Sequence, residues 1–352
     1  MKAAWTALVL AVGLLRAGDG WAGIEFHAAE FFPLGGGGGG VAVGDFNGDG
    51  FLDAAVATQG SVAVFLGDGK GHLSGPVLTP GAGDVAVGDF NEDGKLDLAV
   101  SDDPGSQVVI LLGNGLGGFS PGGTVSLGSN RRPSAIAVGY FNGDRHQDLA
   151  VVEFYGGSVA VLLGAGNGTF SAPVHYPAGG DRPAHLVLGD FNGDGKPDMA
   201  VALCGETCNS YHRGVAVLLG NGDGTFGAPT LIFSLVGITS LGVADFDGDG
   251  KLDLAALSPK APNPDTGKAY ILQGNGLGGF SQVNQFALGM NPESLLVGDF
   301  TRDGRPDLAV INGGEGSLNI FGTLQLFAVT GTGSFTLKSE SLLGHLPVRG
   351  AV

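Results

Sequence analysis

Asp45-Phe46-Asn47-Gly48-Asp49-Gly50-Phe51-Leu52-Asp53 is a nine-residue stretch that recurs, with changes, five more times along the chain of 352 residues. The later copies begin at Asp89, Tyr140, Asp190, Asp245 and Asp299, so successive copies start 44 to 55 residues apart. A period of about 50 residues is typical of repeat proteins, in which each repeat is one supersecondary unit. The repeat therefore overrides the division into two or three domains that length alone would suggest.

Positions one, three, five and nine of the first copy all carry side-chain oxygens, from Asp45, Asn47, Asp49 and Asp53. Carboxylates this close repel one another by about 1–4 kcal/mol per pair at the dielectric of a protein surface. Because no basic residue lies inside this copy, a bound divalent cation is the simplest way to hold them together. Ca²⁺ suits the loop better than Mg²⁺, since it accepts about 6–8 oxygens with loose geometry. The glycine at position six permits the positive φ that wraps the chain round an ion.

Two other kinds of local structure, the EF-hand and the metal-free hairpin, contain loops of similar sequence. An EF-hand needs a Glu at position twelve and a helix on each side. Here position twelve is Val or Ala in every copy, and short apolar runs such as Val41-Ala42-Val43 flank the loop. These flanks predict a loop between two strands. The other alternative is a metal-free Asn-Gly or Asp-Gly hairpin, which six copies with the same oxygen spacing disfavour.

Four short strands fit into each repeat. In the second repeat we expect them at 84–87, 96–100 and 108–112, with a fourth ending near residue 127. Four strands per 50 residues, without helical periodicity, predict an all-β protein built from four-stranded propeller blades. The turn at 113–119 matches the GxGxxG pattern, but a strand follows it where a dinucleotide site needs a helix. Its Phe119 is instead predicted to pack between blades.

Residues 1–22 have the pattern of a secretory signal peptide, which leaves residues 23–352 for the propeller. Lys2 supplies a positive start, Ala7 to Leu15 is apolar, and Gly20-Trp21-Ala22 offers small residues for cleavage. The apolar segment is too short to cross a bilayer, and we expect no membrane helix elsewhere. The sequence thus predicts a secreted, extracellular, periplasmic or cell-surface protein. The alternative is a buried N-terminal helix.

The composition is rich in glycine and acidic. Gly accounts for 68 residues, but without the Gly-X-Y period of collagen. The formal charge of −17 comes from 34 acidic and 17 basic residues, so nucleic acids and anionic membranes are poor partners. Much of the acidity lies in the repeated loops, where bound Ca²⁺ would cancel a large part of it.

The only two cysteines are close together, at Cys204 and Cys208. In a secreted chain this spacing favours one disulfide that closes a surface loop. A zinc site with His212 as a third ligand is the alternative, although the spacing matches no common zinc pattern.

The repeats resemble FG-GAP/VCBS repeats, the modules of the integrin α-subunit N-terminal propeller and of many bacterial secreted proteins. The resemblance covers about residues 24–352 and rests on Gly44–Gly50 with its copies, and on Thr169–Pro173 and Thr225–Pro229. These motifs are specific for the fold and weak for function. The resemblance implies a seven-bladed ring with calcium in the loops that join the first and second strands of each blade.

Carried over to this chain, the resemblance implies four to five Ca²⁺ sites. The third copy is expected to be empty or very weak, because Tyr140 and Arg145 replace the first Asp and the loop glycine, leaving Asn142, Asp144 and Asp148. The sixth copy has Thr301 at position three and is expected to bind less tightly. The implied metal ligands are Asp45, Asn47, Asp49, Asp53; Asp89, Asn91, Asp93, Asp97; Asp190, Asn192, Asp194, Asp198; Asp245, Asp247, Asp249, Asp253; and Asp299, Asp303, Asp307.

The two ends of the chain resemble edges of one further blade. Residues 344–352 align with 289–297, where the next ion loop would follow, and residues 24–34 resemble an outer strand. We therefore expect six full repeats plus partial edges of a seventh. The hypotheses are a truncated seven-bladed ring and a six-bladed ring with frayed ends.

The face opposite the ion loops carries connections of variable length, and such loops on a rigid scaffold commonly bind ligands. The alternative is that they are simply solvated. A secreted calcium-stabilised module that binds a protein or glycan is the favoured function. A polysaccharide lyase or hydrolase is the alternative, although no GxSxG or HExxH motif occurs. Candidate ligand-binding residues are Arg131, Arg132, Arg182, Tyr211, His212 and Arg213.

Overall fold

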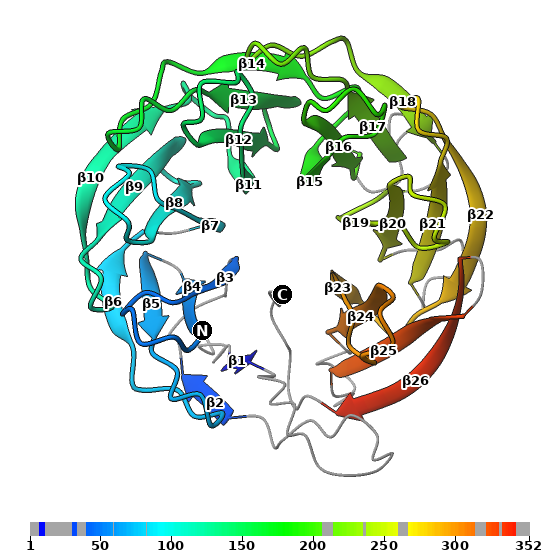
Figure 1. The fold of residues 1–352 in the computed structure, drawn as a ribbon, viewed down its shortest axis with the longest axis horizontal. Coiled ribbons are helices and arrows are strands. Elements are labelled where there is room, and N and C mark those ends of the chain that lie inside the picture. The colour runs from blue at the N-terminus through cyan, green and yellow to red at the C-terminus, as the bar shows by residue number, and fades with distance from the viewer. Residues whose placement is uncertain are drawn as a thin grey trace, which may run out of the picture.

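The computed structural model is a ring of six four-stranded antiparallel sheets arranged like blades around a central axis (Figure 1). The structure describes residues 7–10, 30–33, 40–58, 60–81, 83–205, 214–234, 237–259, 267–313, 322–330 and 333–342. Every regular element in these ranges is a strand, and no helix suited to crossing a membrane occurs in them. The predicted all-β propeller with six full repeats is confirmed.

The blades follow one another along the chain, and each uses four consecutive strands. Blade 1 is β3 (Val41–Gly44), β4 (Asp53–Ala57), β5 (Ser61–Phe65) and β6 (Val77–Pro80). Blade 2 is β7 (Val85–Gly88), β8 (Asp97–Asp102), β9 (Gln107–Gly113) and β10 (Phe119–Ser126). Blade 3 is β11 (Pro133–Gly139), β12 (Asp148–Glu153), β13 (Ser158–Leu162) and β14 (Val174–Pro177). Blade 4 is β15 (Pro183–Gly189), β16 (Asp198–Leu203), β17 (Gly214–Leu218) and β18 (Thr230–Phe233). Blade 5 is β19 (Ser240–Ala244), β20 (Asp253–Ser258), β21 (Lys268–Gly274) and β22 (Phe280–Ala287). Blade 6 is β23 (Pro292–Gly298), β24 (Asp307–Asn312), β25 (Thr323–Thr330) and β26 (Ser334–Leu342).

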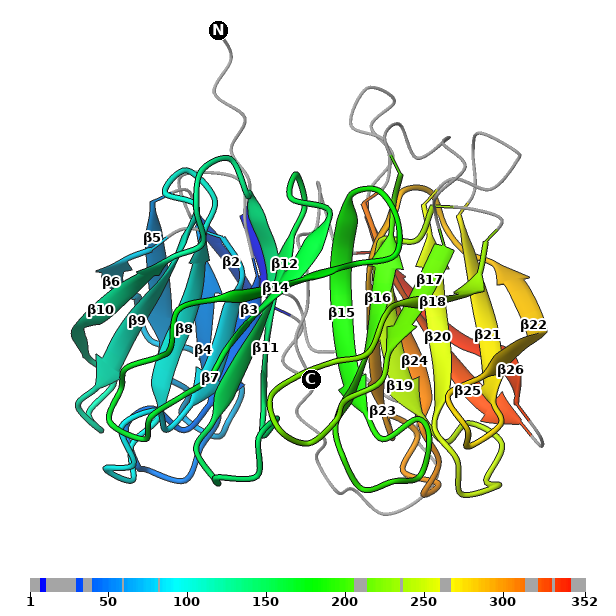
Figure 2. The same ribbon diagram turned by 90° about the horizontal axis from the view of Figure 1, so that it is seen from above.

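Within a blade the first strand lies nearest the axis and the fourth lies at the rim (Figure 1). This meander puts the loop after strand one and the turn after strand three at one face of the ring. The hairpin after strand two and the connection to the next blade lie at the other face, as the side view shows (Figure 2). The predicted strands of blade 2 agree with β7 to β10 within two residues.

A two-stranded sheet lies between blades 1 and 6, formed by β1 (Ala7–Leu10) and β2 (Glu30–Pro33) (Figure 1). β2 falls inside the segment 24–34 that was predicted as an outer strand of a further blade. β1 falls inside the predicted signal peptide, and cleavage of that peptide would remove the partner of β2. Residues 344–352, the other predicted edge, lie outside the described residues.

The hydrophobic core consists of layers between neighbouring blades rather than one central cluster. The second strand of each blade is buried on both faces, which explains its nearly continuous apolar sequence. In β12, for example, Leu149 and Val151 pack toward blade 2, whereas Ala150 and Val152 pack toward blade 4. Blades 2 to 5 therefore depend on a neighbouring blade on each side to bury their faces.

Aromatic pairs connect successive blades on the face of the repeated loops. Position two of the loop is Phe in all six copies. In the first five copies its ring meets the Phe that follows the third strand of the next blade. The ring of Phe141, for instance, lies edge-on to Phe226 at 5.3 Å. The predicted packing of Phe119 between blades is confirmed by its edge-on contact with Phe46. The other pairs are Phe90–Phe170, Phe191–Phe280 and Phe246–Phe335.

Candidate calcium loops and ligand face

Six acidic loops, one per blade, join the first and second strands on one face of the ring. In the first loop, the carboxylate of Asp45 accepts backbone N–H bonds from Gly48 (2.7 Å), Asp49 (3.1 Å) and Gly50 (2.8 Å). The hydrogen bond from Gly50 is the largest cause that lowers the pKa of Asp45 below its ordinary value. The same wrapping recurs at Asp190 and Asp245. In these three loops the backbone therefore wraps around the first carboxylate.

The Asp at position nine has a structural role that its sequence position alone did not reveal. Asp198 is fully buried, and its two oxygens accept the N–H groups of Phe191 (2.9 Å) and Gly220 (2.8 Å). It therefore joins the loop to the end of the third strand. Burial is the main cause that raises the pKa of this carboxyl. The equivalent residues Asp53, Asp97, Asp148 and Asp253 make the same pair of bonds.

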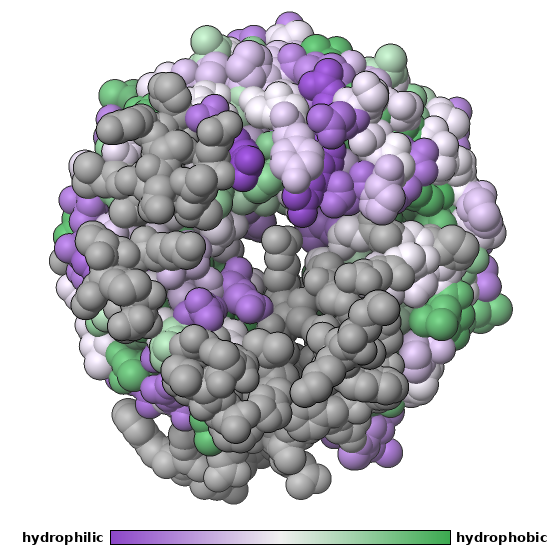
Figure 3. Space-filling view, turned by 180° about the vertical axis from the view of Figure 1, so that it is seen from behind, coloured by the Kyte–Doolittle hydropathy of each residue, from purple (hydrophilic) through white to green (hydrophobic). Residues whose placement is uncertain are grey.

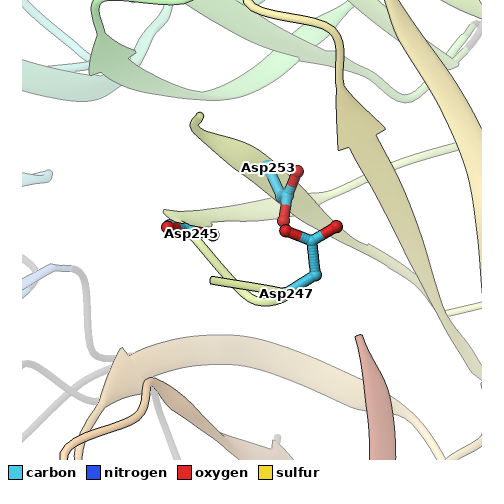
Figure 4. Close-up of side chains that lie close together, drawn as sticks. All are labelled: Asp245, Asp247 and Asp253. Carbon is cyan, nitrogen blue, oxygen red and sulfur yellow. The ribbon is translucent and has the colours of Figure 1, made fainter. Parts of the chain in front are cut away.

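The fifth loop brings three carboxylates together in a geometry suited to a cation. Oxygens of Asp245, Asp247 and Asp253 all lie within 4.8 Å of one another, the only such group in the ranges described above. Figure 4 shows the carboxylates of Asp247 and Asp253 pointing toward each other. Gln273 also donates to Asp247, at the wall of a cavity of about 260 Å³. Because a carboxylate offers about four lone-pair sites, each of these residues keeps acceptor capacity for a hard cation.

Position seven is a lysine in three loops, whereas the first copy has Phe51 there. Lys251 donates to Asp249 at 2.6 Å, and this bond is the largest cause that lowers the pKa of Asp249. Lys95 and Lys196 pair in the same way with Asp93 and Asp194, at 3.2 and 3.5 Å. Position five, predicted as a metal ligand, is thus turned toward a lysine in these loops.

The third loop departs from the others in its structure as it does in sequence. Arg145 adopts a φ of 74°, the left-handed conformation that glycine has at this position elsewhere. Tyr140 is 51% exposed where the other loops have a carboxylate. His146 instead bonds Glu92 of the second loop at 2.5 Å. A side-chain contact between the second and third loops therefore lies at this corner.

The sixth loop keeps the wrapping around its first carboxylate. Asp299 accepts the N–H groups of Asp303 and Gly304, at 3.0 and 2.9 Å. Thr301 replaces the usual Asn, and its backbone N–H donates to Asp307. Its hydroxyl oxygen is buried without a hydrogen-bond partner in the described ranges. This loop therefore has a hydroxyl in place of an amide oxygen at position three.

The opposite face carries the predicted ligand-binding arginines, and the structure brings them together. Arg132 and Arg182 lie 5.2 and 5.6 Å from the centroid of the Phe154 ring. Arg131 reaches the buried carboxylate of Glu153, at 3.5 Å. Strongly hydrophilic side chains gather over blade 3 on this face (Figure 3). The predicted residues Tyr211, His212 and Arg213 lie outside the described residues.

Four residues beside these arginines escaped the sequence prediction: Phe154, Tyr155, Asp181 and Glu153. The first two follow β12 directly and precede Gly156 and Gly157. An aromatic pair before a glycine turn was the available signal. Glu153 is the last residue of the buried strand β12. Nothing in the neighbouring sequence indicates that a surface arginine lies close to its carboxylate.

Cys204 is buried and takes part in a disulfide. Its predicted partner, Cys208, lies outside the described residues, as does His212 of the zinc alternative.

Profiles of known families match the chain over the same repeats. The FG-GAP-like repeat matches residues 45–100, 89–151, 140–201 and 203–256, and the FG-GAP repeat matches residues 291–334. The chain therefore belongs to the FG-GAP repeat family, as its loops indicated. A search of curated proteins by sequence finds no match.

Solved structures share the fold at low sequence identity. One is a lectin of Agrocybe aegerita, described as recognising non-reducing terminal N-acetylglucosamine, with 18% identity and a TM-score of 0.55 over 90% of this chain and 85% of the lectin. A functionally unknown protein of Desulfotomaculum acetoxidans has 13% identity and a TM-score of 0.57 over 90% of both chains. A Lactobacillus plantarum protein has 17% identity and a TM-score of 0.56 over 84% and 82%.

Proposed function

We propose that this protein is a secreted, calcium-stabilised propeller that binds an extracellular glycan or protein through the face opposite its acidic loops. The proposal rests on one observation, which is that the two faces of the ring differ in how much they vary from blade to blade. One face repeats the same acidic loop and the same aromatic contact from blade to blade. The other face varies, and its described residues gather arginine and aromatic side chains around a hollow.

Calcium has a structural task in this proposal. The loops hold several carboxylates within a few residues of the aromatic contacts between blades, so a cation that neutralises them stabilises the ring. Loops one, two, four and five supply the most complete donor sets, and loop six supplies a weaker one. Affinities of about 10⁻⁴–10⁻³ M are typical of extracellular modules and would suffice outside a cell.

Secretion is supported by the pattern of residues 1–22. Sequencing the N-terminus of protein purified from the culture medium tests it directly. We expect the mature chain to begin near residue 23. A mature chain that still begins at Met1 would contradict the cleavage.

A glycan ligand is supported by the polar nature of the hollow and by the lectin with the same fold. The lectin likeness concerns the fold alone at 18% identity, so we do not transfer its sugar to this chain. The hollow offers two aromatic rings and several hydrogen-bonding side chains, a combination that suits the apolar and hydroxyl parts of a sugar.

Two measurements test the function together. Thermal unfolding and elemental analysis with and without a chelator should give a lower melting temperature and the loss of four to five Ca²⁺ per chain. Calcium-loaded protein should then bind at least one glycan or cell surface without changing it. Identical melting in both conditions would refute the calcium role. Depolymerisation of a polysaccharide would instead support the enzymatic alternative.

A further inference from the structure

A hollow of about 510 Å³ lies where the connections before blades 3 and 4 meet the hairpin between β12 and β13. Its lining includes Asn130, Tyr155, Gly156, Asp181 and Arg182, together with the aromatic ring of Phe154. The volume falls within the usual range for small-ligand sites, about 300–1,000 Å³. The hollow lies on the face opposite the acidic loops.

The backbone fixes two arginines here in the same way: Arg182 lines the hollow, and Arg132 lies against the Phe154 and Tyr155 rings of its wall. Arg132 and Arg182 have φ values of 51° and 49°, a conformation uncommon for residues other than glycine. Each precedes a proline that begins the innermost strand of its blade. The carbonyl of Arg132 accepts the N–H of Phe154 at 3.0 Å, and that of Arg182 accepts the N–H of Cys204 at 3.1 Å. Asn291, before Pro292 of blade 6, has the same φ of 49° and accepts the N–H of Gly313. The conformation therefore belongs to the repeat, and it holds both arginines on the same face of the ring.

The guanidinium of Arg132 is held in place while most of its donors are unused. It lies over the rings of Phe154 and Tyr155, at 5.2 and 5.0 Å, and donates to the Tyr155 hydroxyl at 2.7 Å. Asp103 lies 3.2 Å from its Nε. A guanidinium has five N–H donors, and its contacts with Tyr155 and Asp103 engage only part of them. The remaining donors can receive a ligand oxygen while both contacts stay in place.

The charge of Arg131, which precedes Arg132, is balanced by a buried acid. Glu153 is fully buried, and its Oε2 accepts from Ser158 at 2.5 Å and lies 3.5 Å from Arg131. A Cβ added at Gly156 would lie 3.1 Å from Arg131 Nη1, so glycine leaves this guanidinium close to the hollow. The same oxygen of Glu153 also lies 2.9 Å from His175 Nδ1, so the buried acid serves both side chains without reaching the surface. Arg131 and Arg132 each have an acidic partner, and both are partly exposed in a chain whose formal charge is −17.

We propose that this hollow binds a carboxylate-bearing sugar, such as a uronic or sialic acid unit of an extracellular glycan. This inference rests on the proposed binding function and names the ligand class of its site. A planar carboxylate matches the fork of a guanidinium and can be bound by two parallel N–H bonds. Asn130 and Asp181 can meet hydroxyl groups, and the exposed ring of Tyr155 can cover the apolar face of a sugar.

Other ligand classes fit the same residues less well. Protein interfaces centre on apolar anchors, whereas this hollow is lined mainly by polar residues and glycines. Phosphate carries more negative charge than a carboxylate, and Asp181 in the wall would repel it more strongly. A singly charged acid on a hydroxyl-rich ring satisfies both the arginines and the acidic residue.

The test compares acidic and neutral forms of the same sugar. The probes are trigalacturonate, glucuronate-containing oligosaccharides and sialyllactose, each beside its methyl ester, measured by titration calorimetry on the calcium-loaded protein. We expect each acid that binds to bind at least tenfold more tightly than its ester. Arg132→Gln should weaken that binding by about 10- to 100-fold, because one charge-assisted contact contributes about that much.

Matched variants keep the result interpretable. Lys70→Gln removes one positive charge from an exposed turn on the opposite face and should leave the affinity unchanged. Tyr155→Phe removes the hydroxyl that orients Arg132 and should weaken binding by a few-fold, so it replaces Arg132→Gln if that variant does not fold.

Equal binding of acids and esters, or unchanged binding in both the Arg132→Gln and Tyr155→Phe variants, would overturn the ligand class while leaving the binding function intact. A calcium-loaded protein that binds no acidic probe but does bind neutral glycans or proteins also overturns it. Failure to bind any glycan or protein would defeat the proposed function itself.

Discussion

Replacing Asp198 by Asn separates the two roles of the ninth loop position. The carboxylate is fully buried and accepts backbone N–H groups from Phe191 and Gly220. Asn has one acceptor oxygen, so its amide N–H₂ must face one of these two donors. A buried donor without an acceptor costs about 1–3 kcal/mol. We therefore expect Asp198→Asn to lower the free energy of unfolding by about that amount even when no calcium is present.

The assay is urea unfolding in excess chelator and again in excess calcium, at one pH. Asp190→Asn is the matched control, because Asp190 accepts its N–H bonds in an exposed part of the same loop. In chelator the control should differ little from the unchanged protein, whereas Asp198→Asn should be clearly less stable. In calcium both variants should lose stability, since occupancy of a site at about 100 times its Kd contributes about 2.7 kcal/mol. If Asp198→Asn matches the unchanged protein in chelator, the buried carboxylate acts only through a metal, and the structural role assigned to it is wrong.

Three further predictions follow from other contacts. Phe141→Ala removes a buried ring that packs on Phe226 of the next blade, and it should lower the free energy of unfolding by about 3–5 kcal/mol in thermal or urea melts; a loss below 1 kcal/mol would mean that the contact between these blades is not cooperative. The double variant Tyr140→Asp with Arg145→Gly restores the missing carboxylate and the loop glycine, so elemental analysis should find about one more Ca²⁺ per chain, and an unchanged metal content would contradict the account of the third loop. Asp223→Asn should cost stability near neutral pH, because the hydrogen bond from Thr225 Oγ1 is the largest cause that lowers the pKa of Asp223 below 3.8. A carboxyl with a lowered folded pKa stabilises above its unfolded pKa and loses that contribution as the pH falls through the folded one, so melts of the two proteins should converge in strong acid; a difference that persists there would exclude the charge as its origin.

The fold could be predicted because its signal is local and repeated. Each loop places oxygen-bearing side chains and glycine at fixed spacing. The apolar runs on both sides are too short for helices and therefore predict short strands. The blade boundaries in the second repeat agree with the prediction within two residues for that reason. The departure of the third loop was also visible, since Tyr140 and Arg145 stand where the other loops have an Asp and a glycine.

The structural role of the Asp at position nine could not be predicted from spacing along the sequence. Its spacing from Asp190 indicates a metal ligand, and nothing nearby in sequence reveals that Gly220, 22 residues later, donates to Asp198. Likewise, the lysines at position seven are plainly visible in the sequence, but only side-chain geometry turns Lys251 toward Asp249.

The sequence by itself determined the repeat, the all-β blades, the acidic loops and the family, because these depend on spacing within about ten residues. Only the tertiary structure decided which residues form the hollow on the opposite face. Asn130, Tyr155 and Arg182 come from three separate connections, and they meet because blades 3 and 4 pack face to face. Contacts made across blades depend on that packing, and no short-range pattern records them.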